Sequence, residues 1–181
     1  LVGSEMCIRD RLSSGLEQFE KIPQIESISF RGCQNLEDEV EHLLKLENIK
    51  HLDIAKTDAS FEVINKILQK NKELETLCLK TRELTNERFV DVNLPLLKDL
   101  DLEGCHISSE NFHDLVKEGA SHLEYLNLSK VKKLTTECFE IFKGFTALKE
   151  VETDEELIVY GRLIAYMKMR EEVEKIPDWQ R

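Results

Sequence analysis

One pattern recurs six times along the chain, at intervals of 23 to 26 residues. It consists of an apolar residue, two variable residues, an apolar residue, one variable residue and a third apolar residue. A repeat of this length indicates one structural unit used many times, in which no unit buries its apolar face without its neighbours. The copies are Ile25-x-x-Ile28-x-Phe30, Ile49-x-x-Leu52-x-Ile54, Leu74-x-x-Leu77-x-Leu79, Leu97-x-x-Leu100-x-Leu102, Leu123-x-x-Leu126-x-Leu128 and Leu148-x-x-Val151-x-Thr153, the last of which departs from the pattern at its final position.

The alternation within each copy indicates a short strand, because successive side chains of a strand point to opposite faces. A second pattern, apolar-[Ser/Thr]-x-Glu-x-Phe, follows at 84–89, 107–112 and 134–139, with a weaker form at 59–64. Its Ser or Thr suits the N-cap of a helix, and its Glu lies in the first turn, where the helix dipole favours an anion. Each repeat is therefore predicted to contain one strand and one helix, and the long connection makes successive strands parallel.

These patterns resemble the leucine-rich repeat family, in particular its cysteine-containing, F-box-associated type and its ribonuclease-inhibitor type, over roughly residues 20–153. The resemblance implies an α/β solenoid shaped like a horseshoe, with a curved parallel sheet on the concave face and helices on the convex face. It also implies that Cys33 and Cys105, which share one repeat position, are buried at the turn after the strand. Arg82 and Val131 depart from the residue types of that position, which predicts looser turns in the third and fifth repeats.

Three regions are predicted along the chain. Residues 1–11 resemble a translated sequencing adapter, which makes them a non-native tail that takes no part in the fold. Residues 12–154 are predicted to form the solenoid of about six repeats, with 12–22 as the helix of an earlier repeat whose strand is missing upstream. Residues 155–181 are predicted to form a C-terminal capping helix and tail, and the alternative interpretation is an amphipathic helix that binds a partner or a membrane.

Composition limits the possible functions. The chain has 25 Lys and Arg against 36 Asp and Glu, a net charge of −11, which argues against a nucleic-acid partner. No apolar run reaches the ~18–20 residues that a membrane-spanning helix needs, which argues against a membrane partner. The 5 cysteines are too scattered for a disulfide framework, which predicts a reducing compartment, cytoplasmic or nuclear. We expect a monomer or a part of a larger chain.

Catalysis, metal binding and cofactor binding are not predicted. The chain contains no C-x-x-C, H-E-x-x-H, G-x-x-x-x-G-K or G-x-G-x-x-G motif. Asp99, Asp101 and Glu103 are predicted to lie on one strand face about 6.5–7 Å apart, a spacing that suits an inverting glycosidase. An open, wet sheet surface neither excludes water nor perturbs a carboxyl pKa, so the sequence predicts no enzyme.

The outward-pointing positions of the strands are the candidate partner-binding residues. Repeats one to three carry cations such as Arg31, Lys56 and Lys80, whereas repeats four to six carry mainly acids. We expect the acidic half to dock a basic surface of a partner protein, with Tyr125 as an aromatic anchor. The alternative is an ordinary solvated charged face. The candidate binding residues are Asp99, Asp101, Glu103, Tyr125, Asn127, Glu150, Glu152, His51 and Lys80.

The favoured function is a non-enzymatic scaffold that binds a partner protein on its concave face. The resemblance to the cysteine-containing repeats implies the substrate-recognition part of a ubiquitin-ligase adaptor. The alternative is a regulator of an enzyme, of the ribonuclease-inhibitor-like or the leucine-rich GTPase-activating type. GTPase activation would need a catalytic arginine, for which Arg31 and Arg82 are the candidates in the repeats.

Overall fold

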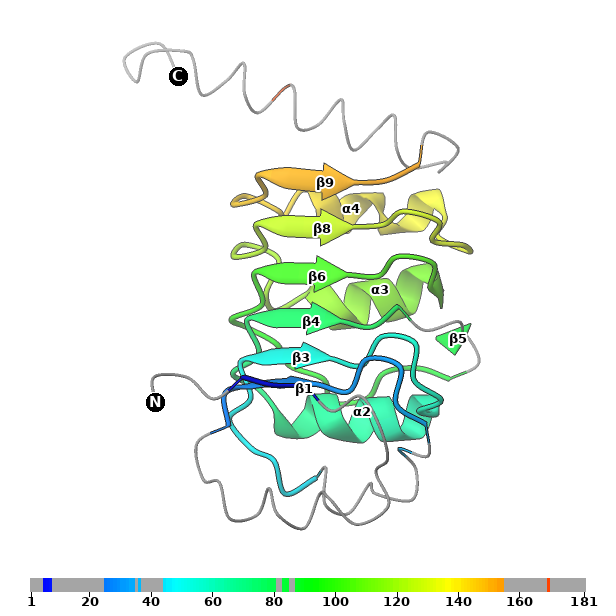
Figure 1. Cartoon of the computed structure of the whole chain (residues 1–181). Helices are drawn as coiled ribbons and strands as arrows, with labels where there is room; N and C mark the ends of the chain where they lie inside the picture. The colour runs from blue at the N-terminus through cyan, green and yellow to red at the C-terminus, as the bar shows by residue number, and fades with distance from the viewer. Residues whose placement is uncertain are drawn as a thin grey trace, which may run out of the picture.

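A computed structural model describes residues 5–7, 25–34, 36, 44–80, 83–84, 87–154 and 169. Within these residues, seven short strands form one all-parallel sheet, in chain order along the sheet (Figure 1). All six copies of the repeat pattern contain one of these strands, as predicted. The strands are β1 Glu5–Cys7, β2 Ser27–Ser29, β3 His51–Asp53, β4 Thr76–Cys78, β6 Asp99–Asp101, β8 Tyr125–Asn127 and β9 Glu150–Glu152.

The central residue of each repeat strand lies opposite the central residue of the next. Leu77 pairs with Leu100, and Leu100 pairs with Leu126, so the three form adjacent rungs of one ladder. All three side chains are fully buried, whereas Val151 at the last strand is only half-buried. The predicted ladder of inward leucines is therefore confirmed, and it places the variable residues of each strand on the opposite face.

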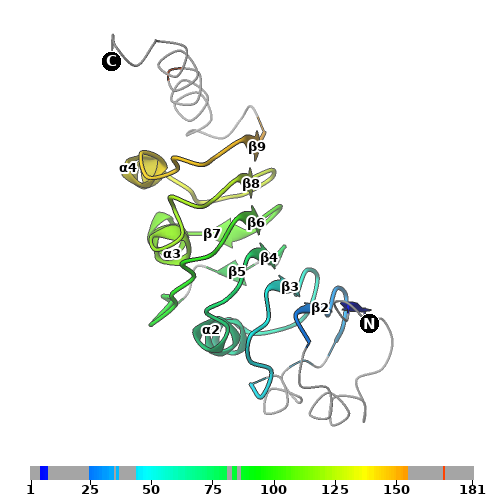
Figure 2. The same cartoon turned by 90° about the vertical axis from the view of Figure 1, so that its left-hand side faces the viewer.

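In the part of the chain that the structure describes, three α-helices lie together on one side of the sheet (Figure 2). They are α2 Phe61–Lys70, α3 Ser109–Val116 and α4 Phe139–Phe142, and the 3-10 turn η2 Thr136–Cys138 precedes α4. Ser60 and Ser108 cap the first two helices by accepting hydrogen bonds from backbone N–H groups three residues later. These caps are the serines that the second sequence pattern predicts.

The third repeat has no helix in its described residues 87–98, so the prediction of one helix in every repeat is wrong there. This repeat is the shortest, with an interval of 23 positions between its first residue, Leu74, and the first residue of the next repeat, Leu97. It also contains Pro95, which lacks a backbone N–H, and Asp91, whose φ of 54° is not helical. A second sheet of two strands, β5 Glu83–Leu84 and β7 His106–Ile107, links this repeat to the next.

A tight turn follows the strands. Each of the first five repeats has a residue with a positive φ angle six or seven positions after its first residue. These residues are Gly32, Lys56, Lys80, Gly104 and Lys130. The residue after this position is buried in the first, fourth and fifth repeats, and its N–H donates to the carbonyl three residues earlier. The donors are Cys33 at 2.8 Å, Cys105 at 2.9 Å and Val131 at 3.1 Å. Repeat five therefore keeps the turn despite Val131, with the longest of the three hydrogen bonds, and Arg82 lies outside the described residues.

Residues near the N-terminus take part in the sheet. Strand β1 pairs in parallel with β2, and Met6 lies opposite Ile28. The structure thus gives a strand to part of the segment predicted to take no part in the fold, at the place of the strand predicted to be missing. Residues 12–24 and the predicted capping helix lie outside the described residues, apart from Met169. No helix in the described ranges is long and apolar enough to cross a membrane.

Candidate functional site

The outer face of the sheet is the face away from the helices (Figure 2). It carries two rows of side chains, because alternate residues of each strand point to this face. The register aligns the rows across the strands, so residues about 25 positions apart in sequence become neighbours. A shallow hollow of about 570 Å³ crosses β2 to β8 on this face. The first row is Ser27, His51, Thr76, Asp99, Tyr125 and Glu150, and the second row is Ser29, Asp53, Cys78, Asp101, Asn127 and Glu152.

The structure brings the predicted binding residues together on this face. Seven of them lie in the two rows, and Lys80 and Glu103 follow the carboxyl ends of β4 and β6. Their charges are not independent, because the long lysine side chains reach across to neighbouring strands.

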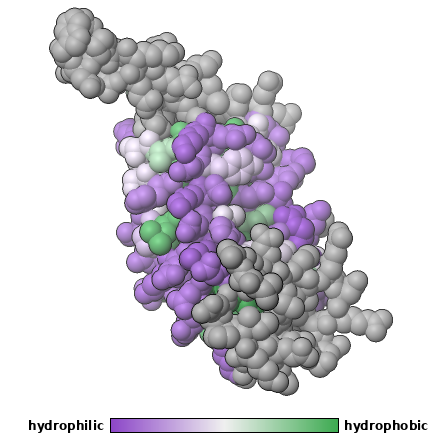
Figure 3. Space-filling view, turned by 60° about the vertical axis from the view of Figure 1, so that its left-hand side comes forward, coloured by the Kyte–Doolittle hydropathy of each residue, from purple (hydrophilic) through white to green (hydrophobic). Residues whose placement is uncertain are grey.

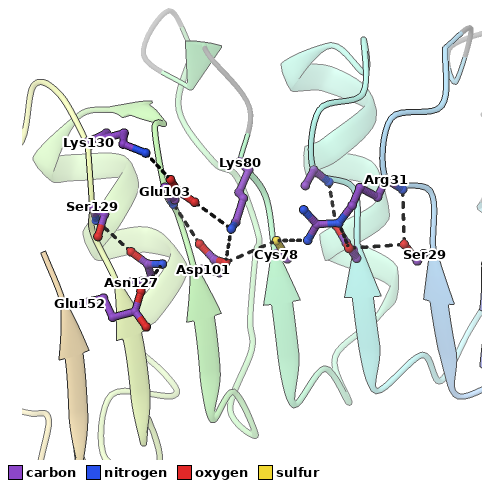
Figure 4. Close-up of polar contacts among 12 residues, drawn as sticks. Ser29, Arg31, Cys78, Lys80, Asp101, Glu103, Asn127, Ser129, Lys130 and Glu152 are labelled. Atoms are coloured by element: carbon purple, nitrogen blue, oxygen red, sulfur yellow. Dashed lines mark hydrogen bonds and ion pairs between the residues drawn. The ribbon is translucent and has the colours of Figure 1, made fainter.

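Lys80 is the centre of an ion-pair cluster at the carboxyl ends of β4 and β6 (Figure 4). Its Nζ lies 2.9 Å from an oxygen of Asp101 and 2.9 Å from an oxygen of Glu103. Lys130 approaches Glu103 from the other side, at 2.7 Å. The hydrogen bonds from the two ammonium groups lower the pKa of Glu103 to about 2. Part of the predicted acidic half is therefore neutralised within the protein.

A second cluster lies on β2 and β3, where Arg31 Nε donates to Asp53 at 2.7 Å. Cys78 connects the two clusters, because its Sγ lies 3.4 Å from the guanidinium of Arg31 and 3.8 Å from Asp101 (Figure 4). Burial, followed by the charges of Asp53 and Asp101, raises the pKa of the Cys78 thiol to about 12. The thiol stays protonated at neutral pH, so its place is structural and not nucleophilic.

A hydrogen-bonded chain runs across β3, β4 and β6 in the first row. The Thr76 hydroxyl donates to Asp99 Oδ2 at 3.4 Å, and His51 Nδ1 lies 3.0 Å from the same hydroxyl oxygen. Because threonine has a single hydroxyl proton, Nδ1 must be the donor in its own contact. The other ring nitrogen of the exposed His51 is then an acceptor whenever the imidazole is neutral.

Tyr125 and Asn127 on β8 lie beside Glu150 and Glu152 on β9. Asn127 Nδ2 donates to Glu152 Oε2 at 3.0 Å, and Asn127 itself is buried. Burial, followed by a hydrogen bond to Glu152, raises the pKa of the half-buried Tyr125 to about 12. Glu152 is therefore the acidic neighbour that most raises the pKa of the tyrosine that the sequence predicts as an anchor.

One regular feature of the sheet was not predicted from the sequence. Just before the six repeat strands, at their amino ends, acidic and basic residues alternate along the sheet. Lysine Nζ atoms lie 2.6–2.7 Å from the glutamate of the preceding strand in three pairs, which we call the charge ladder. In the sequence, the ladder is visible because the second residue of the repeat pattern alternates between glutamate and lysine. The ladder residues are Glu26, Lys50, Glu75, Lys98, Glu124 and Lys149.

The rest of the described surface and core adds no chemical site. Figure 3 shows that hydrophilic residues cover most of the described surface on the view toward the amino ends of the strands. Every buried side-chain nitrogen and oxygen in the described residues has a hydrogen-bond partner. The same part of the chain holds no group of three or more side chains that could bind a metal ion.

No protein-family model matches the chain, and no curated protein matches it. A solved structure described as Leiomodin-1 Actin-Binding Site 2 (ABS2) is similar, with 16% sequence identity, a TM-score of 0.49, and coverage of 93% of this chain and 95% of that chain. This similarity is too weak to support an argument about function. The repeat pattern and the all-parallel sheet themselves fit a leucine-rich repeat fold.

Proposed function

We propose that the outer face of the sheet binds a partner protein that presents a basic surface. The observation that carries the proposal is the charge of the face over β6, β8 and β9. Six carboxylates lie there, and among the described residues two ammonium groups, those of Lys80 and Lys130, make ion pairs with them. Complementary charge of this kind steers a basic partner to the face. The carboxylates are Asp99, Asp101, Glu103, Glu150, Glu152 and Asp154.

The proposal takes the sheet as the concave face of a leucine-rich-repeat horseshoe. The aligned parallel register and the regular interval between strands support this arrangement. Burial of Cys33 and Cys105 at the turn after the strand supports the cysteine-containing type of repeat, and with it the substrate-recognition part of a ubiquitin-ligase adaptor. Such an adaptor is a non-enzymatic scaffold, and its partner would be a protein substrate.

The alternative of an enzyme regulator divides into two cases. An inhibitor of a basic enzyme fits the acidic face equally well. A GTPase-activating module is disfavoured, because the guanidinium of Arg31 is held by Asp53 at 2.7 Å and by Cys78 at 3.4 Å. The other candidate, Arg82, lies outside the described residues.

The test is a charge reversal that spares the ion pairs of the fold. Asp101 is unsuitable because it pairs with Lys80 and accepts the N–H of Glu103 at 3.0 Å. We therefore choose Asp99→Lys with Glu150→Lys, since neither carboxylate makes an ion pair within the described residues. Glu118→Lys, an exposed position beyond the end of α3, is the control that reverses one charge away from the face, a change of +2 against +4 for the double variant.

The measurement is the association rate with the partner. The partner is captured with the full chain, identified and purified, and its binding is followed at low and high salt. The double variant should associate at least about tenfold more slowly and lose most of its salt dependence, because electrostatic steering is removed. The Glu118→Lys control should keep both properties. An unchanged rate in the folded double variant would show that the partner binds elsewhere.

A further inference from the structure

Tyr125 stands between two carboxylates in the first row of the sheet face. The parallel register places Asp99 directly beside it on one side and Glu150 directly beside it on the other. Neighbouring strands lie about 4.8 Å apart, so the two acidic residues are roughly 10 Å apart with the phenol ring between them. Asp99 and Tyr125 also line the hollow of the face.

These two carboxylates have capacity to accept further hydrogen bonds. Asp99 accepts from Thr76 through Oδ2, and its other oxygen accepts no hydrogen bond from the described residues. Glu150 is exposed and forms no ion pair or side-chain hydrogen bond within the same residues. The other carboxylates around them differ, because Asp101 and Glu103 pair with lysines and Glu152 accepts from Asn127. Asp99 and Glu150 are thus the acids of this face most ready for a partner.

The ring between them is half-buried. Glu152, which follows Glu150 on the next strand by two residues, accepts from the buried Asn127 at 3.0 Å. The aromatic ring is therefore what the middle of this row offers a partner. A tyrosine side chain has few rotatable bonds, so it loses little conformational entropy when a partner binds.

We infer that Asp99, Tyr125 and Glu150 form a subsite for an arginine side chain of the partner protein. The inference rests on the proposed function of the face. A guanidinium is planar, so it stacks on an aromatic ring while its N–H groups donate in the plane to carboxylates. Its donors point to more than one side, which suits acids on both sides of the ring. A lysine ammonium is a compact and strongly hydrated charge that matches one carboxylate at a time.

The experiment uses the full chain and three capped pentapeptides of the form Gly-Gly-X-Gly-Gly, in which X is arginine, lysine or citrulline. Binding is followed by the NMR shifts of the Tyr125 ring and of the backbone amides of β6, β8 and β9. The arginine peptide should shift these signals and bind at least about threefold more tightly than the lysine peptide. The citrulline peptide, which keeps the shape and lacks the charge, should not bind detectably.

Variants assign the binding to the three residues. Tyr125→Leu should weaken the arginine peptide about threefold to tenfold, whereas Tyr125→Phe keeps the ring and should keep the preference for arginine. Asp99→Asn with Glu150→Gln should weaken it about tenfold, because charge-assisted hydrogen bonds are lost. Amide shifts elsewhere in the protein verify that each variant is folded.

Two results would overturn the inference. One is equal binding of the arginine and lysine peptides, and the other is unchanged arginine binding in folded Tyr125→Leu. Either result leaves the docking of a basic partner intact if the Asp99→Lys, Glu150→Lys variant still loses that partner. Loss of arginine selectivity and loss of the docking function are therefore separate outcomes.

Discussion

Asn111 on α3 satisfies backbone groups of the third repeat, whose described residues 87–98 form no helix. Its side chain is 1% exposed and makes three hydrogen bonds to backbone groups of that repeat. The amide nitrogen donates to the carbonyls of Leu84 at 2.5 Å and Glu87 at 2.7 Å, and the amide oxygen accepts from the N–H of Phe89 at 3.0 Å. One side chain thus satisfies backbone groups that a helix would satisfy internally.

We predict that Asn111→Ala lowers the free energy of unfolding by about 3–5 kcal/mol. Three backbone groups lose their partner, two of them in buried contacts, and each unsatisfied group costs roughly 1–3 kcal/mol when water does not replace the partner. The assay is urea unfolding followed by circular dichroism at neutral pH. Asn111→Asp should be destabilised as well, because it keeps the acceptor for Phe89 and loses both donors.

Asn65→Ala is the matched control. Asn65 on α2 makes a single hydrogen bond of the same kind, accepting from the N–H of Val90 at 3.0 Å in an exposed position. Its loss should cost about 1 kcal/mol or less. If Asn111→Ala loses no more than Asn65→Ala, the reasoning that Asn111 organises the third repeat is refuted.

Further variants test the turns and the lysine cluster. Lys56→Gly should raise the free energy of unfolding in urea by about 0.5–1 kcal/mol, because Lys56 has a φ of 58° that glycine adopts without strain. Gly104→Ala, at φ 73°, should cost about 1–2 kcal/mol in the same assay. Gly119→Ala should cost more in thermal unfolding, because its new Cβ would lie 2.5 Å from the carbonyl oxygen of Leu94. The pKa of Glu103 is lowered to about 2, so its ionised form stabilises the fold at any pH above the ordinary glutamate pKa. This stabilisation is lost as the pH falls toward 2. When the pH falls from about 5 to 2.5, the free energy of unfolding of Glu103→Gln should therefore decrease by roughly 1 kcal/mol less than that of the wild type, a figure reduced for solvent exposure.

The strands and their register could be predicted from sequence because they depend on local alternation. The apolar spacing of each copy defines which side chains point inward, and repetition then aligns Leu77, Leu100 and Leu126. The outward rows follow from the same alternation. This is why the predicted binding residues do lie on one face.

The helices and the charges were harder to predict. The third repeat carries the helix pattern at 84–89, but Pro95 and the short spacing leave no helix in residues 87–98. Lys80 belongs to the basic half in sequence, yet its ammonium lies among the acids of the next strand. Which carboxylates remain unpaired depends on such contacts between strands, and composition does not reveal them.

The charge ladder restricts how this chain can change in length. The charged residue before each repeat strand has the opposite sign to the corresponding residues of the neighbouring strands. Excising one whole repeat would therefore bring two like charges together. Removal of the unit that holds Lys50, for example, would set Glu26 beside Glu75. Facing like charges destabilise a sheet by some tenths of a kcal/mol up to about 1 kcal/mol. Excising two consecutive units restores opposite signs. The chain should therefore tolerate the removal or insertion of an even number of repeats better than that of an odd number.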